Sequence, residues 1–120
     1  MDCLAMGVNV MEQMDAAQLV ADLFKALGHP TRVKILDILR QGEICVCEMA
    51  PRLELEQSNV SQHLAILRNQ GLVTFYKDGL RVVYRLANPK VVLLLDAAAE
   101  LLTRQIQVQQ SVLSQLSRNG

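Results

Sequence analysis

Cys45 and Cys47, separated by a single residue in the stretch EICVCEM, are the side chains best suited to chemistry in this sequence. Thiolates bind soft metal ions and metalloids, and they also oxidise to disulfides. On a regular helix, residues two apart point about 200° away from each other, so these sulfurs could not share a ligand there. Pro51 is tolerated only within a first helical turn, so a helix here should start at Cys47 or later. Cys45 would then lie in extended chain, and we expect both sulfurs to converge at a helix N-terminus, which favours thiolates.

A further thiolate would have to come from Cys3, because the sequence contains three cysteines in all. Trivalent arsenic and antimony take about three thiolates, and cadmium and lead roughly three or four, all being soft ions that select sulfur. Residues 1–14 show no clear periodicity, and we interpret them as an N-terminal arm long enough to bring Cys3 to the pair. A site of two thiols without Cys3, and three inert buried cysteines, remain as alternatives.

The composition indicates one domain with an aliphatic, mainly helical core. Of the 120 residues, 51% are hydrophobic but only 3% are aromatic, and the formal net charge is zero. A neutral composition does not indicate a nucleic-acid partner, so local charge has to decide that question. Few cysteines and no signal segment fit a reducing cytoplasm, and the longest apolar run, Val91 to Leu95, is too short to span a bilayer. We therefore expect a cytoplasmic protein with no membrane segment.

Apolar periodicity and capping residues predict two helices in the first third of the chain. Asp15 and Gly28 bound the first helix, whose apolar residues repeat with a helical period. Pro30 suits the first turn of the second helix, because the backbone donor that proline lacks would be unsatisfied there. This second helix should end at Gly42, with its buried side formed by Val33, Ile35, Leu36 and Leu39.

The rest of the chain predicts a short helix at CEMAPRL, a longer helix at QSNVSQHLAILRNQG, a β-hairpin and a long last helix. Asp78-Gly79 marks the hairpin turn, while Asn88 and Pro89 begin the last helix. A short helix, a turn, a second helix and a hairpin follow the plan of a winged helix-turn-helix. We expect a mainly α, dimeric protein of this kind, with residues 15–118 forming the DNA-binding and dimerisation domain.

The longer helix has one apolar side and one small polar side. Val60, Leu64 and Leu67 share the first, while Ser58 and Gln62 point the opposite way, as required of a helix that reads base edges in a major groove. Residues 57–85 contain four basic side chains and one acid, a local balance of +3 that suits phosphate contacts. The pattern therefore predicts double-stranded DNA as a partner. The basic residues are Arg68, Lys77, Arg81 and Arg85.

The stretches ALGHPTRVKILDILRQGEICVCEMA, SNVSQHLAILRNQGLV and KDGLRVVYRL resemble the ArsR/SmtB family of metal-sensing bacterial transcriptional repressors, over about residues 15–110. EICVCEM is similar to the cysteine motif of the arsenic-, cadmium- and lead-responsive members. The resemblance implies a homodimer that binds an inverted repeat in its own operator and needs no obligatory cofactor. It also implies release of DNA when As(III) or Sb(III), or Cd(II) or Pb(II), binds the thiolates of Cys45, Cys47 and Cys3.

The resemblance also implies where DNA and the second subunit would bind. Family members have a histidine near His63 that affects DNA binding, although its place at the edge of the apolar side equally suits a packing role. The predicted DNA-binding residues are Gln57, Ser58, Asn59, Ser61, Gln62, His63, Arg68, Lys77 and Arg81, with Asp78 and Gly79 completing the wing. The predicted dimer interface on the last helix, packed with the first helix, includes Val92, Leu95, Ala98, Ala99, Leu102 and Ile106.

The sequence departs from the family pattern at three positions. Glu54 stands where the turn usually has glycine, and Glu56 stands where serine or threonine usually caps the recognition helix. Either Glu56 points away from the phosphates or Ser58 caps that helix instead. Ala50 stands where some members have a third cysteine, so the motif alone provides two thiolates rather than three.

Two other functions compete with metalloid sensing. A redox- or reactive-sulfur-sensing repressor of the same fold would use the same thiols, and because cysteines two apart form a strained ring, Cys3 would be the preferred disulfide partner. A small thiol oxidoreductase is disfavoured, because the sequence lacks a βαβ pattern and a convincing acid or base beside the pair. We therefore expect a protein that is not an enzyme.

Overall fold

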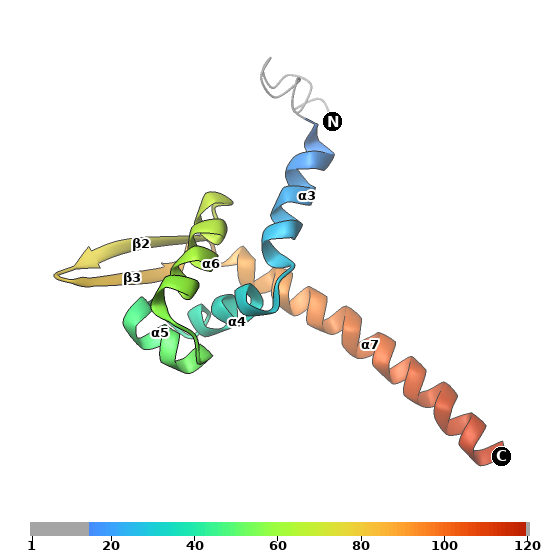
Figure 1. Cartoon of the computed structure of the whole chain (residues 1–120). Coiled ribbons are helices and arrows are strands. Elements are labelled where there is room, and N and C mark those ends of the chain that lie inside the picture. Colours follow the sequence, from blue (N-terminus) through green and yellow to red (C-terminus); the bar gives the residue numbers. More distant parts are fainter. Residues whose placement is uncertain (1–14, 120) are drawn as a thin grey trace. The chain divides into compact units, whose positions relative to one another are not determined.

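The computed structural model describes residues 15–119, which divide between Asn88 and Pro89 into two compact units (Figure 1). The helices of the first unit are α3 (Ala16–Leu27), α4 (Pro30–Leu39), α5 (Val46–Leu53) and α6 (Gln57–Asn69). Its strands are β1 (Ile44–Cys45), β2 (Val73–Asp78) and β3 (Arg81–Leu86). The second unit is one long helix, α7 (Lys90–Asn119). The predicted mainly helical fold with one β-hairpin is confirmed.

The predicted caps of α3 and the predicted place of Pro30 in the first turn of α4 are confirmed, whereas the cap of α4 by His29 was not predicted. The Asp15 side chain accepts a hydrogen bond from the Ala17 amide at 2.9 Å, and Gly28 follows the last turn of α3. His29 caps α4 with its Nδ1, which accepts from the Thr31 amide at 3.1 Å, and Pro30 is the first helical residue. Helix α4 ends at Leu39, earlier than predicted, and i→i+3 hydrogen bonds continue the chain to Gly42.

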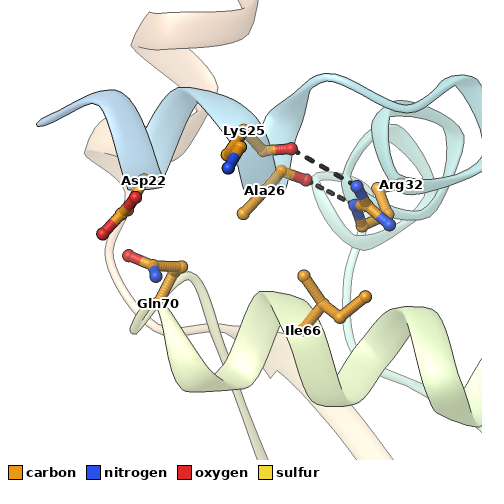
Figure 2. A pocket seen from close by; sticks show the side chains of 6 residues that line it. All are labelled: Asp22, Lys25, Ala26, Arg32, Ile66 and Gln70. Carbon is orange, nitrogen blue, oxygen red and sulfur yellow. Dashed lines mark hydrogen bonds between the residues drawn. The ribbon is translucent and has the colours of Figure 1, made fainter. Parts of the chain in front are cut away.

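The buried side of α4 is formed by Ile35, Leu36 and Leu39, as predicted, but not by Val33, whose side chain is 40% exposed. Val33 lies two residues before Ile35, so it faces away from the core side of the helix. Arg32 joins α4 to the end of α3, as Figure 2 shows: its guanidinium donates to the Ala26 carbonyl at 2.6 Å and to the Lys25 carbonyl at 3.3 Å. A cation at these last carbonyls stabilises the C-terminus of α3.

Helix α5 begins at Val46, so the predicted start at Cys47 or later is wrong. Cys45 has extended backbone angles and acts as the N-cap, since its sulfur accepts the Cys47 amide at 3.0 Å. Pro51 therefore lies inside the helix, where it leaves the Cys47 carbonyl without its usual i+4 donor. A helix of only eight residues loses a single hydrogen bond in this way, and packing of its buried side against α6 and β3 offsets that loss.

The sheet has the strand order β1-β3-β2 and is antiparallel throughout. Asp78 pairs with Arg81, so Gly79 and Leu80 form the two-residue turn, and Gly79 has a φ of 64°, a value that glycine adopts readily. The short strand β1 pairs Cys45 with Val83, which attaches the thiol segment directly to the hairpin. Sequence reasoning did not predict this third strand.

The core of the first unit is aliphatic, as the composition predicted. Its fully buried side chains are Cys45 of β1 and residues of α4, α5 and α6, namely Ile35, Leu36, Met49, Val60, Leu64 and Leu67. Helix α7 begins at Lys90, one residue later than expected. It presents many exposed apolar side chains along its length. Among residues 15–119, no helix combines the length and apolar character needed to cross a membrane.

Candidate thiol site and nucleic-acid interface

The two thiols converge at the entrance to α5, as predicted. Their Cα atoms are 5.2 Å apart and a disulfide joins the sulfurs, so Cys45 pairs with Cys47 and not with Cys3, the partner expected from the strain of such a ring. Cys45 is only 2% exposed, whereas Cys47 lies at the surface. Convergence follows from the extended backbone of Cys45, since two helical residues at this spacing would point apart. Cys3 lies outside the described residues, and within residues 15–119 no three His, Cys, Asp or Glu side chains gather as a metal site.

The segment around the thiols is attached to the wing hairpin, β2–β3, by side chains as well as by strand pairing. Glu48 of α5 accepts a hydrogen bond from the Arg81 guanidinium at 2.7 Å, and Glu43 accepts one from the Tyr76 hydroxyl. This bond to Glu43 raises the pKa of Tyr76, with smaller effects of burial and of nearby carboxylates. A movement at Cys45 or Cys47 would therefore reach the wing through β1 and Glu48.

The outward face of α6 is as predicted. Val60, Leu64 and Leu67 are completely buried, which fixes the rotation of the helix about its axis. The exposed polar residues of the first turns are Gln57, Ser58, Asn59, Ser61 and Gln62. A polar helix face of this kind, held by a buried apolar side, can enter a major groove.

The turn before α6 contains both acidic departures from the family pattern. Glu54 has a φ of 58°, in the left-handed region, where a side chain costs roughly 1–2 kcal/mol and glycine is favoured. Glu56 is the N-cap of α6 but makes no capping hydrogen bond with its side chain. Ser58 lies within the helix, so the alternative that Ser58 caps α6 is wrong. Both carboxylates border a hollow beside Ser58 and Gln62.

The predicted basic residues fall into two groups. Lys77 and Arg81 are exposed on the strands next to the hairpin turn, and their contact with DNA stays a prediction. Arg68 lies in the last turn of α6, with its guanidinium 5.1 Å from the centre of the Phe75 ring. Arg81 is also within 4.0 Å of Asp78 on the same hairpin, while its contact with Glu48 joins it to α5.

His63 is half-buried and belongs to a cluster with α4 that sequence reasoning missed. Its ring centre is 4.5 Å from that of His29, and its Nδ1 is 3.2 Å from Arg32 Nη1. A guanidinium only donates, so Nδ1 accepts and the ring is neutral. Burial lowers the pKa of His63, and the electrostatic effects of His29 and of the Arg32 guanidinium lower it further. No local pattern indicates a contact between residues 31 apart in the sequence.

This lowered pKa predicts that acid destabilises the fold through His63. As the pH falls below the ordinary value of about 6.5, the unfolded chain takes up a proton that the folded His63 resists. The stability that neutral His63 contributes above pH 6.5 is therefore lost progressively as the pH falls toward the lower pKa that His63 has in the folded state. Urea unfolding at pH 7.5 and 5.5 should show a larger loss for the wild type than for His63→Asn, whose side-chain oxygen can still accept from Arg32. Equal losses in the two proteins would contradict the neutral, accepting His63.

Helix α5 is followed by α6, whose polar face is exposed, and then by a basic hairpin. This arrangement defines a winged helix-turn-helix DNA-binding protein. Residues 29–74 match the family described as "Bacterial regulatory protein, arsR family". The match covers α4, α5, α6 and the start of the hairpin, the elements that would read DNA. The chain belongs to the ArsR/SmtB family of helix-turn-helix transcriptional regulators, and it is a regulator rather than an enzyme.

Relatives of known sequence and structure agree with this assignment. The uncharacterized HTH-type transcriptional regulator Rv0081 of Mycobacterium tuberculosis is 36% identical over 111 residues, which are 92% of this chain and 97% of the relative. Its crystal structure matches with a TM-score of 0.75 at 35% identity, covering 80% of this chain and 97% of that one.

Two further relatives carry a metal resistance or an assembly in their names. The cadmium resistance transcriptional regulatory protein CadC homolog of Staphylococcus aureus is 41% identical over 80 residues, 66% of each chain. The homodimeric winged helix-turn-helix DNA-binding domain of Mb0332 from Mycobacterium bovis matches with a TM-score of 0.73 at 28% identity, covering 85% of this chain and 94% of that one.

Proposed function

We propose that this protein is a repressor that binds double-stranded operator DNA as a cytoplasmic homodimer. It leaves the operator when As(III) or Sb(III), or a soft metal such as Cd(II) or Pb(II), binds the thiolates of Cys45 and Cys47. The observation that carries the proposal is the convergence of both sulfurs at the N-terminus of α5, the first helix of the DNA-reading pair. Soft thiolate ligands suit these ions, and the relative named for cadmium resistance supports the class of inducer.

Release follows from the contacts of Cys45. Its sulfur caps α5, and its backbone pairs with Val83 of the wing. A bound ion held by both sulfurs would fix the distance between Cys45, which pairs with the wing, and Cys47 of α5, so it would favour a different arrangement of α5 and of Arg81, which Glu48 holds. If that arrangement cannot place both recognition helices on DNA, a preference of about 1–3 kcal/mol shifts the protein off the operator.

The dimer is supported by exposed apolar side chains on α7. Leu102 and Ile106, one helical turn apart, are 58% and 50% exposed, which is unusual for apolar residues of a folded protein with no partner. The homodimeric structure of the Mb0332 domain supports the same assembly. A dimer with two α6 helices suits an operator with two half-sites.

A second candidate is a redox- or reactive-sulfur-sensing repressor of the same fold. The disulfide between Cys45 and Cys47 supports this candidate specifically. Forming a disulfide takes only these two thiols, so this kind of sensor needs no third ligand and no residue outside the described part of the chain. Oxidation would join Cys45, whose backbone pairs with the wing, covalently to Cys47 of α5, and it would remove both free thiolates.

Titration of the reduced protein on its own operator separates the two candidates. Arsenite, antimonite or cadmium should dissociate the complex, as measured by gel shift together with the ultraviolet absorption of metal thiolates. If all three leave the complex intact while peroxide or polysulfide dissociates it, metalloid sensing is wrong and thiol oxidation is the trigger. If none of these dissociates it, the thiol pair does not control release.

The proposed DNA interface predicts different effects for Arg81 and Gln62. Arg81→Ala should weaken binding to operator and unrelated DNA alike and reduce the salt slope by about one, because a phosphate contact is lost. Gln62→Ala should reduce the preference for operator over unrelated DNA, by about 1–3 kcal/mol if the amide reads a base. Fluorescence anisotropy at several salt concentrations measures both effects. Arg104→Ala on α7 is the matched control, and an unchanged Gln62→Ala protein would show that α6 faces DNA differently.

A further inference from the structure

The tip of the wing carries a fully exposed leucine. The hairpin β2–β3 projects from the helices of the first unit, and its turn, Gly79 and Leu80, lies at the far end (Figure 1). Leu80 is 104% exposed, the highest value among the large apolar side chains of residues 15–119. Tyr76, the other exposed large apolar side chain of the hairpin, donates its hydroxyl to Glu43. Leu80 therefore adds nothing to the core, and its apolar surface is available to a partner.

Leu80 lies on the side of the wing that faces the start of α6. It borders a cleft of about 370 Å³ together with Gln57 and Ser61 of that helix. Both residues belong to the exposed polar face of α6 that we place in a major groove. A duplex bound to this face would therefore pass the wing tip, where the groove next to the occupied major groove is a minor groove.

The shape and charge of the tip suit a minor groove. This groove is about 6 Å wide, and phosphates border it on both sides. Gly79 has no side chain, so Leu80 alone projects from the end of the turn. Lys77 and Arg81 flank it from the two strands. Two bases and one acid, Asp78, give residues 77–81 a charge of +1. An apolar side chain between two basic ones matches a groove floor between two rows of phosphates.

We propose that Leu80 enters the minor groove of the operator and inserts partly between two base pairs as an apolar wedge. A leucine side chain has no hydrogen-bond donor or acceptor, so it cannot read base edges. It would instead select a base step that unstacks at low cost, such as TA or CA/TG. This role rests on the proposed function, because it adds a specificity-determining residue to the same DNA contact. Leu80 would thus impose a sequence preference at a position that α6 does not touch.

The first experiment locates the contact by hydroxyl-radical footprinting on promoter DNA of the protein's own gene, because the radical attacks deoxyriboses through the minor groove. The reduced full-length protein should protect a short minor-groove segment beside each half-site. Leu80→Ala should lose this protection and keep the rest of the footprint. Leu93→Ala, which truncates a leucine that is 63% exposed on α7, is the matched control and should give the wild-type footprint. An unchanged footprint in Leu80→Ala would overturn the proposal.

The second experiment compares duplexes that differ only at the protected step, TA in one and AA in the other. The minor groove presents the same acceptors in both, so the comparison isolates deformability. By anisotropy, the wild type should bind the TA duplex about tenfold more tightly, and 2-aminopurine at the step should brighten as it unstacks. Leu80→Ala should bind both duplexes within about twofold of each other, whereas Leu80→Met should retain the preference. A preference that persists in Leu80→Ala, or is absent from the wild type, would overturn the wedge.

The outcomes separate the wedge from the proposed function. If the wild type binds its operator and an inducer releases it, but Leu80→Ala keeps the same footprint and step preference, the wedge is wrong and the proposed function stands. If Leu80→Ala loses both while neither arsenite nor peroxide releases the operator, the wedge stands and the proposed control by thiols is wrong. If the wild type binds no double-stranded DNA, both are wrong.

Discussion

Replacement of Cys45 by serine is expected to abolish the release of operator DNA by arsenite, while the affinity without inducer stays within about twofold of the wild type. Cys45 is 2% exposed and caps α5, accepting the Cys47 amide. Serine is a strongly preferred N-cap, so Cys45→Ser retains the helix entrance and removes only the soft ligand. Cys47 is then the one thiolate left at the entrance to α5, and inducer titrations followed by anisotropy of labelled operator should show no response.

Two further variants separate ligation from structure at this position. Cys47→Ser removes an exposed thiol that caps nothing and should abolish the response equally. Cys45→Ala removes the ligand and the cap together, so it should also lower the free energy of unfolding relative to Cys45→Ser by about 0.5–2 kcal/mol. A full arsenite response in Cys45→Ser would show that the thiol pair is not the sensor.

The helices and the hairpin could be predicted because their signals are local. Asp15 caps its own helix, Pro30 begins the next, and Gly79 supplies the left-handed conformation that a two-residue turn needs. The rotation of α6 was equally predictable, because Val60, Leu64 and Leu67 repeat with the helical period and all are fully buried. In each case the residues that determine the structure lie within a few positions of one another.

The features that sequence reasoning missed depend on contacts between distant residues. Strand β1 has only two residues and forms because β3 pairs with it. Two residues are too few to show the alternation of apolar and polar side chains from which a strand is predicted. The early start of α5 was missed because the rule for Pro51 took no account of a sulfur cap at Cys45. The Glu48–Arg81 and Arg32–His63 contacts each span 31 residues or more, and neither sequence neighbourhood predicts a partner.

Substitution of Leu102 by glutamate is expected to produce a monomer and to weaken operator binding at least about 100-fold. Leu102 and Ile106 form part of the exposed apolar face of α7 on which we place the second subunit. A carboxylate buried there would lose its hydration without gaining a partner. A monomer binds one half-site only, and the loss of the second linked contact removes a factor of about 10²–10⁴ in affinity. Sedimentation equilibrium and anisotropy on the same samples measure both effects.

Ser111→Glu provides the matched control for this substitution. Ser111 is exposed on α7, about 180° around the helix from Leu102, so it adds the same charge to the opposite face. We expect Ser111→Glu to remain a dimer and to bind the operator within about threefold of the wild type. The charge itself would weaken binding to phosphates in both variants, so only the difference between them reports the interface. A dimeric Leu102→Glu protein with normal affinity would mean that the subunits associate through another surface, and the apolar face of α7 would then need a different partner.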